Sequence, residues 1–169
     1  MTTDDWAKRV ATLWDISDEL GDNILLERMD ALVAERPATD ARAAYEAGSV
    51  RDSIGLEAEA APHYQRALEL GADGSLGESL TTQLRIQYAS TLRNLGRYDE
   101  GLALLDAIPA DDELADAAAA FRALILSSAG ELPAALSLAL ATLATHLPRY
   151  QRSVLAYAHE LPVRLANGE

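Results

Sequence analysis

Glycine recurs after apolar segments at a spacing of 34 residues, and this period constrains the fold more than any other feature of the chain. The glycines concerned are Gly21, Gly55, Gly96 and Gly130. Their separations are 34, 41 and 34 residues, so the middle interval is one period with seven extra residues. A fixed period of this length is typical of proteins built from stacked structural repeats.

Each of these glycines separates two segments with helical periodicity. Before Gly96, for example, Leu84, Tyr88 and Leu92 recur at intervals of four residues, and a second apolar series starts at Leu102. We therefore expect each glycine to be the C′ residue of one helix, with a positive φ, and the acids that follow it to lie in the first turn of the next helix. Because strand and hairpin signals are absent, the sequence predicts an all-α fold of helix–turn–helix units.

The 34-residue helical hairpin resembles the tetratricopeptide repeat. In the unit that starts at Ala41, the small residues of that repeat fall on Gly48, Gly55 and Ala60, and a bulky one falls on Tyr64. The resemblance implies one right-handed α-solenoid domain, closed by a C-terminal capping helix. Its expected parts are a degenerate repeat at 7–40, repeats at 41–74, 82–115 and 116–149, an inserted loop at 75–81, and the capping helix and tail at 150–169.

The resemblance also implies a function, because such repeats usually bind a protein or peptide in a concave groove lined by the first helix of each pair. The side chains best suited to hold an extended peptide there are Arg42, Tyr45, Gln83, Ile86, Arg93 and Asn94. The alternative is that they form only a solvated helix face. Some members hold acidic chaperone tails through a Lys and an Asn at positions that Tyr45 and Ser49 occupy here, so we do not expect recognition of such tails.

The face of the last repeat is small and apolar, with Ala117, Ala120 and Leu124. It is either a partner groove or a surface covered by the C-terminal helix. The sequence favours covering, because an apolar stripe in the C-terminal segment needs a surface to pack on. This stripe consists of Tyr150, Val154, Tyr157 and Leu161.

A second hypothesis is self-association through the end helices, which would make a homodimer. It is motivated by aromatic residues near both ends of the chain, namely Trp6, Trp14, Tyr150 and Tyr157.

The charge and cysteine content exclude several classes of function. The net charge is -13, from 14 basic and 27 acidic residues, so the surface repels nucleic acids and anionic membranes and favours basic or neutral protein partners. The absence of cysteine excludes disulfides and thiolate metal sites. No secretory signal and no apolar run of about 20 residues is present, so we expect a cytoplasmic protein. A single lysine among 14 basic residues suggests a GC-rich bacterial genome.

Catalytic motifs are also missing. None of His63, His146 and His159 has a partner at metal-binding helical spacing, and the glycine-rich segment 71–77 lacks the Lys-Ser/Thr of a phosphate loop. We therefore expect no metal, no cofactor and no catalytic residue. An enzyme with an unrecognised acid–base site remains a remote alternative.

Overall fold

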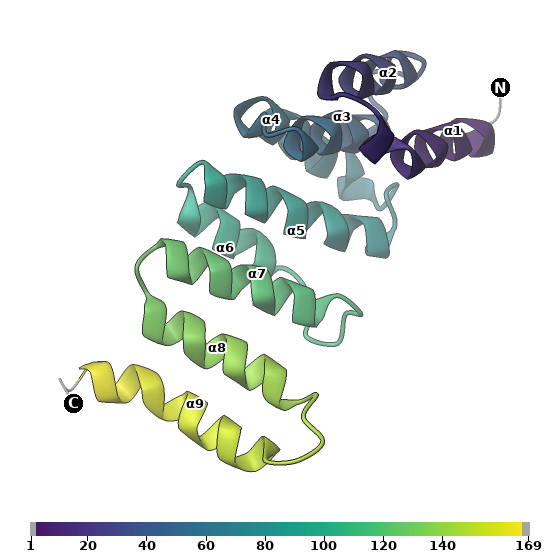
Figure 1. The fold of residues 1–169 in the computed structure, drawn as a ribbon. Helices are drawn as coiled ribbons and strands as arrows, with labels where there is room; N and C mark the ends of the chain where they lie inside the picture. Colours follow the sequence, from purple (N-terminus) through teal and green to yellow (C-terminus); the bar gives the residue numbers. More distant parts are fainter. Residues whose placement is uncertain (1–2, 167–169) are drawn as a thin grey trace. The chain divides into compact units, whose positions relative to one another are not determined.

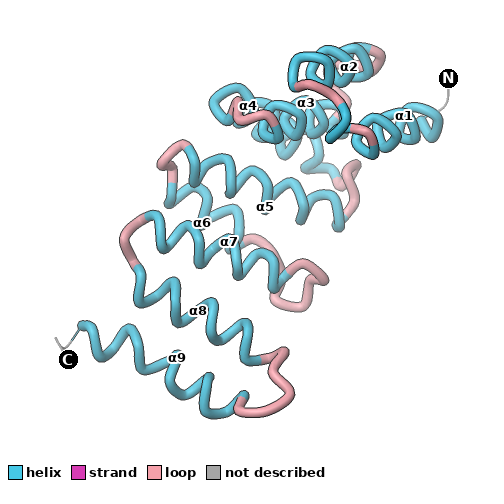
Figure 2. Tube along the Cα trace, viewed as in Figure 1, coloured by secondary structure: helices cyan, strands magenta, loops and turns pink. Residues whose placement is uncertain are grey.

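The regular structure is entirely helical in residues 3–166, the part of the chain that the computed structural model describes, with side chains described for residues 5–161 (Figures 1 and 2). The predicted all-α fold is therefore confirmed. The helices are α1 (Thr3–Asp15), α2 (Asp22–Ala34), α3 (Ala41–Ser53), α4 (Glu57–Leu70), α5 (Glu78–Asn94), α6 (Tyr98–Asp106), α7 (Ala115–Ser128), α8 (Leu132–Ala144) and α9 (Gln151–Ala166), with short 3₁₀ turns η1 (Ser17–Glu19) and η2 (Gly71–Asp73).

The chain divides into two compact units, residues 1–84 and residues 85–169, and the division falls inside α5. In the first unit α2 packs on both α1 and α3, and α3 packs on α4. In the second unit α7 packs on α6 and α8, and α9 packs on α8. Helices adjacent in sequence are therefore adjacent in space within each unit, as expected for a stack of helical hairpins.

The same turn joins α3 to α4, α5 to α6, and α7 to α8. Gly55, Gly96 and Gly130 have φ values of 78°, 74° and 88°, which confirms them as left-handed C′ residues. At the first turn, the N–H of Gly55 donates to the carbonyl of Asp52 at 3.1 Å, and the next N–H donates to the carbonyl of Arg51 at 2.8 Å. This hydrogen-bond pair defines a Schellman motif, and it recurs at Gly96 and Gly130.

Gly21 does not follow this rule, and the expectation that it ends a helix in the left-handed conformation is wrong. Its φ of -75° and ψ of 150° are extended, and it is the N-cap of α2. The reason is local: α1 ends at Asp15, and the 3₁₀ turn η1 has already reversed the chain before Gly21 is reached. The first hairpin is therefore closed by a different connection from the other three.

The connection after α4 is shorter than the loop expected at 75–81. The turn η2 prolongs α4 as far as Asp73, and α5 already begins at Glu78. Gly74 and Gly77, with φ values of 84° and 74°, lie in the connection between these two elements. The division of the chain into exact repeats stays a prediction.

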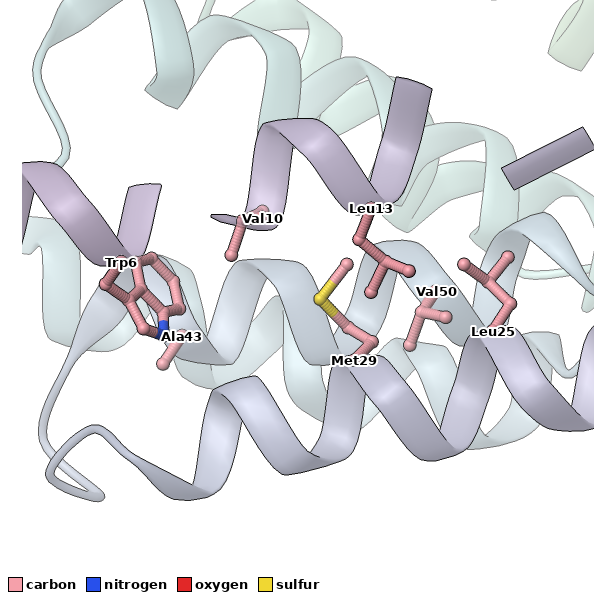
Figure 3. Close-up of a cluster of buried hydrophobic side chains, with 7 residues drawn as sticks. All are labelled: Trp6, Val10, Leu13, Leu25, Met29, Ala43 and Val50. Carbon is pink, nitrogen blue, oxygen red and sulfur yellow. The ribbon is translucent and has the colours of Figure 1, made fainter. Parts of the chain in front are cut away.

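The core of the first unit lies between α1, α2 and α3 (Figure 3). Its buried side chains are Trp6, Val10, Leu13, Leu25, Met29, Ala43 and Val50. The indole N–H of Trp6 donates to the carbonyl of Leu32 at 2.8 Å, so this large ring is buried without leaving its polar atom unpaired. The hairpin of α1 and α2 is thus fixed to α3 by apolar packing.

Close contact between α3 and α4 depends on the absence of a side chain at Gly48. A Cβ atom there would lie 2.7 Å from Cδ1 and 2.9 Å from Cε1 of Tyr64, whose side chain is fully buried. The small and bulky positions of the predicted repeat therefore face each other. In the second unit, Gly101 of α6 makes a similar approach to Ala89 and to Ile125 in the cluster shared by α5, α6 and α7.

Candidate functional site

An apolar groove of about 800 Å³ lies between α7 and α8 in the second unit. The α7 side of the groove consists of Asp116, Ala120, Ala123, Leu124 and Ser127, and the α8 side consists of Leu132, Ala135, Leu136, Ala139, Thr142 and Leu143, followed by His146. Alanine and leucine make up most of this lining. Such a surface suits the burial of apolar side chains more than it suits reaction chemistry.

Four leucines of the groove are unusually exposed. The exposed fractions are 46% for Leu124, 62% for Leu132, 50% for Leu136 and 52% for Leu143. Single exposed leucines are common on protein surfaces, but a contiguous apolar patch more often marks an interaction site. The groove is therefore the strongest candidate for a functional surface in the second unit.

The sequence pattern explains why these residues share one groove. On both helices the lining residues recur at intervals of four, three and four, the spacing that keeps side chains on one face of a helix. On α7 the series is Asp116, Ala120, Ala123 and Ser127, and on α8 it is Leu132, Leu136, Ala139 and Leu143. Ala123 and Ala135 are buried in the groove, while the four leucines are exposed.

The ionisable lining residues lie at one end of the groove, and the rest of the lining is uncharged. Helix α8 contains no charged residue. At the charged end, Nε2 of His146 lies 2.8 Å from Oδ2 of Asp116, and both side chains are well exposed. The exposed acids Asp111 and Glu113 just before α7, and the exposed arginines Arg149 and Arg152 just after α8, lie at the same end.

Helix α9 leaves the groove open, and the expectation that it covers the face of the last repeat is wrong. Ala120 and Leu124 are exposed, while Tyr150 and Tyr157 of the expected stripe are 76% and 68% exposed. The helix instead packs on α8 and fully buries Ala158, whose small side chain permits a close approach. The large aromatic residues consequently point away from the packed face.

Three of the predicted contact residues belong to the first unit, and they differ in accessibility. Tyr45 is only 6% exposed, with its ring 6.2 Å from that of Tyr64. Arg42 is half-exposed; its guanidinium lies 5.9 Å from the Tyr45 ring, and its Nε donates to Glu46 at 2.7 Å. Gln83 is exposed. Burial raises the pKa of Tyr64 above its ordinary value.

The other three predicted contact residues belong to the second unit. Ile86 is 7% exposed and packs in the core cluster of α5, α6 and α7. The Nε of Arg93 donates to Oγ of Ser128 at 2.7 Å, and its Nη1 donates to Oδ1 of Asn94 at 3.4 Å. Asn94 is exposed. Tyr45 and Ile86 are therefore too buried to contact a partner directly. The accessible residues of the predicted set are Arg42, Gln83, Arg93 and Asn94, and their role stays a prediction.

The aromatic residues that motivated self-association also separate into two groups. Trp6 is 2% exposed in the core of the first unit, and the indole N–H of Trp14 donates to Oε2 of Glu46 at 2.9 Å. Both side chains are held inside the first unit, so the expectation that Trp6 and Trp14 contribute to self-association is wrong. Only Tyr150 and Tyr157 remain exposed.

Sequence reasoning found the α7 side of the groove, with Ala120 and Leu124, but it favoured covering by the C-terminal helix and did not include Leu136 and Leu143 of α8. The sequence of α8 contains a clearer indication of an exposed apolar surface. The 13 residues of α8 contain no charge, whereas a surface helix normally alternates an apolar stripe with a charged face. A helix that is apolar on most sides needs either complete burial or a partner, and α7 and α9 together leave part of α8 exposed.

Two further features of the described residues bear on function. No group of three or more histidine, aspartate or glutamate side chains is arranged there to hold a metal ion. No helix among those described combines the length and the apolar character that crossing a bilayer requires.

Comparison with known protein families identifies the family of the chain. The sequence model of the family described as tetratrico peptide repeat matches residues 41–161, from the start of α3 into α9. No curated protein matches the chain, and no solved structure does so either.

Proposed function

Because the chain belongs to the tetratricopeptide repeat family, whose members generally mediate protein–protein interactions, we propose that it is a non-catalytic adaptor that binds a protein or peptide partner. The net charge of -13 opposes binding to nucleic acids and anionic membranes, so a protein partner is favoured. The cytoplasmic location and the bacterial origin expected from the sequence are part of the same proposal.

The observation that carries this proposal is the open apolar groove between α7 and α8. Full burial of a leucine side chain contributes about 1.5–3 kcal/mol, so covering a half-exposed leucine contributes roughly 1 kcal/mol. Leu124, Leu132, Leu136 and Leu143 each have this potential, because about half of each side chain is still in contact with water. A partner that covers them together gains several kcal/mol before the costs of association are subtracted.

The chemistry of the lining favours binding over catalysis. The ionisable side chains that line the groove are Asp116 and His146, and they lie exposed at one end of it. General acid–base catalysis requires such groups within hydrogen-bond reach of a bound substrate, commonly in a site that excludes water. The remainder of the lining offers alanine, leucine and two hydroxyl groups.

A capture experiment with matched variants tests the proposal. The double variant Leu132→Gln with Leu136→Gln makes the groove polar without adding charge, and glutamine is a good helix former. The control is Ile24→Gln, because Ile24 is 48% exposed on α2 in the other unit. We expect the control to retain the partners that the unmodified chain captures from a native lysate, and the groove variant to lose them. Unchanged capture by the groove variant would contradict the proposal for this surface.

A further variant tests the predicted concave face as the binding surface. The variant Arg93→Ala with Asn94→Ala removes accessible polar residues of the predicted concave face; if only this variant loses partners, binding occurs at that face.

Exposed Tyr150 and Tyr157 favour self-association as a second function. Light scattering over a range of concentrations tests it, and a monomer at the highest concentration would exclude it.

A further inference from the structure

We infer that the occupant of the α7–α8 groove is a single amphipathic α-helix of a partner protein, about three turns long, with an uncharged apolar stripe and basic residues at one end. This inference rests on the proposed function, since it names the kind of partner that the same groove takes. Four features of the groove support it: the scarcity of polar groups, the spacing of the lining residues, the small size of several of them, and the charge.

The scarcity of polar groups in the groove favours a helix over an extended peptide. An extended peptide presents unpaired backbone N–H and C=O groups, which must find partners when they are buried. Along most of the groove the lining is aliphatic, and the hydroxyl of Thr142 already donates to the carbonyl of Leu138 at 3.0 Å. A helix satisfies its own backbone groups, so it can enter this groove without that cost.

The spacing of the groove residues matches that of a packed helix. From Leu132 to Leu143 the groove extends over twelve residues of α8, or about 17 Å for eleven steps with a rise of 1.5 Å each. The lining residues on both sides of the groove recur at intervals of four, three and four, as at the a and d positions of coiled coils, where a facing helix inserts its side chains as knobs. A helix with apolar residues at intervals of four, three and four therefore contacts both sides along its whole length.

Small residues in the groove favour large apolar residues on the partner. The lining includes Ala123 and Ala135, which are buried, beside leucines that are about half-exposed. A two-fold contact between two copies of this chain would use the same patch on both subunits, so it would supply no large side chains beyond these leucines. Each copy would also carry a net charge of -13. A convex helix from another protein fits better than a second copy.

The charge of the protein favours basic residues on the partner. Asp116 borders the groove at one end, where the exposed Asp111 and Glu113 precede α7 and the exposed Arg149 and Arg152 follow α8. Basic residues at one end of the partner helix would complement these carboxylates and the net charge of -13 of the whole protein. The middle of the partner's stripe stays uncharged, because α8 carries no charge to pair with it.

Synthetic peptides test this inference on the full chain. The probe is a fluorescein-labelled helical peptide with leucines at intervals of four, three and four and three arginines at one end. The two controls are a scrambled peptide of the same composition and a peptide with glutamates in place of the arginines. By fluorescence anisotropy, we expect the probe to bind about tenfold or more tightly than the acidic peptide, with the difference reduced at high salt, and the scrambled peptide to bind weakly.

Protein variants locate the binding site. We expect Leu136→Gln and Leu143→Gln each to weaken binding of the probe by about fivefold to tenfold, because each removes about 1 kcal/mol of apolar burial. Ile24→Gln, matched for exposure, is expected to leave the affinity unchanged. Asp116→Asn is expected to weaken binding of the basic peptide but not of the acidic one.

Each contrary result has a defined meaning. Equal binding of the scrambled peptide, or no binding of the probe, overturns the helical partner, while the lysate experiment separately decides whether the groove binds a protein. If light scattering shows a dimer that Leu136→Gln disperses, the occupant is a second copy and the inference is wrong.

Discussion

Replacing Gly48 with alanine should destabilise the first unit, because the new methyl group would overlap the ring of Tyr64. The added Cβ would lie 2.7 Å from Cδ1, 2.9 Å from Cε1 and 3.1 Å from Cγ of that ring. Favourable carbon–carbon contacts lie at about 3.5–4.0 Å, so the ring or the helix must move by nearly 1 Å. The ring has little room, since it is fully buried and Tyr45 lies on it at a centroid distance of 6.2 Å.

The magnitude follows from two opposing contributions. Overpacking of a core costs about 1–3 kcal/mol, and the closeness of three ring atoms places Gly48→Ala at the upper end. Alanine in place of glycine inside a helix recovers about 1 kcal/mol of helix propensity. We therefore expect a net loss of about 2 kcal/mol in the free energy of unfolding of this unit. Gly101→Ala is the control, because Gly101 is also a close-packed helical glycine but belongs to the second unit.

Urea denaturation followed by tryptophan fluorescence measures the effect selectively. The chain contains two tryptophans, Trp6 and Trp14, and both lie in residues 1–84. The fluorescence transition thus reports the first unit even if the two units unfold separately. Gly48→Ala should move this transition to lower urea, whereas Gly101→Ala should leave it in place.

A double-mutant cycle checks the cause. In a Tyr64→Leu background the ring is gone, so Gly48→Ala should become neutral or stabilising. The reasoning would be refuted if Gly48→Ala cost nothing in the natural background, or if it cost the same amount in the absence of the ring.

Three other predictions concern stability. Gly96→Ala should lower the free energy of unfolding by about 1–2 kcal/mol, because φ is 74° at this position. Gly21→Ala, at a φ of -75°, should lower it by less than about 1 kcal/mol. Thermal unfolding of both variants measures the difference, and equal losses would contradict the reasoning. Trp14→Phe should cost about 1–3 kcal/mol by urea titration, since it removes a donor from the buried carboxylate of Glu46. Partial burial lowers the pKa of His63 below its ordinary value, so the unfolded chain binds the proton more readily and stability falls as the pH drops below about 6.5. His63→Gln should flatten that slope in denaturation curves between about pH 7 and 5, and an unchanged slope would exclude His63 as its source.

The turns and hairpins could be predicted from the sequence because their causes are local. A glycine that ends an apolar helical segment supplies the positive φ of a Schellman motif, and Gly55, Gly96 and Gly130 adopt it. Gly21 shows the limit of that reasoning: a 3₁₀ turn of only three residues, at 17–19, changed the role of the glycine that follows it. Such a short turn has no distinct signature in the apolar pattern.

The candidate site was harder to predict, because exposure depends on which helices cover which faces. Tyr45 and Ile86 fall at positions that the repeat turns towards a groove, yet both are covered in the structure. Leu136 and Leu143 have the spacing of core residues, yet both are about half-exposed. The deciding feature is that α9 packs on α8 and leaves Ala120 and Leu124 of α7 exposed, and local periodicity does not encode this tertiary packing.

The shared turn of the α3–α4, α5–α6 and α7–α8 hairpins bears on how the chain reaches its native state. Each turn is closed by hydrogen bonds between residues three and five apart in sequence, and each hairpin joins helices that are neighbours in sequence. The contact order is therefore low, and loop-closure entropy opposes folding only weakly. Each hairpin can nucleate by itself and recruit the next one, so gain or loss of a whole 34-residue segment during evolution would leave the folding of its neighbours largely intact.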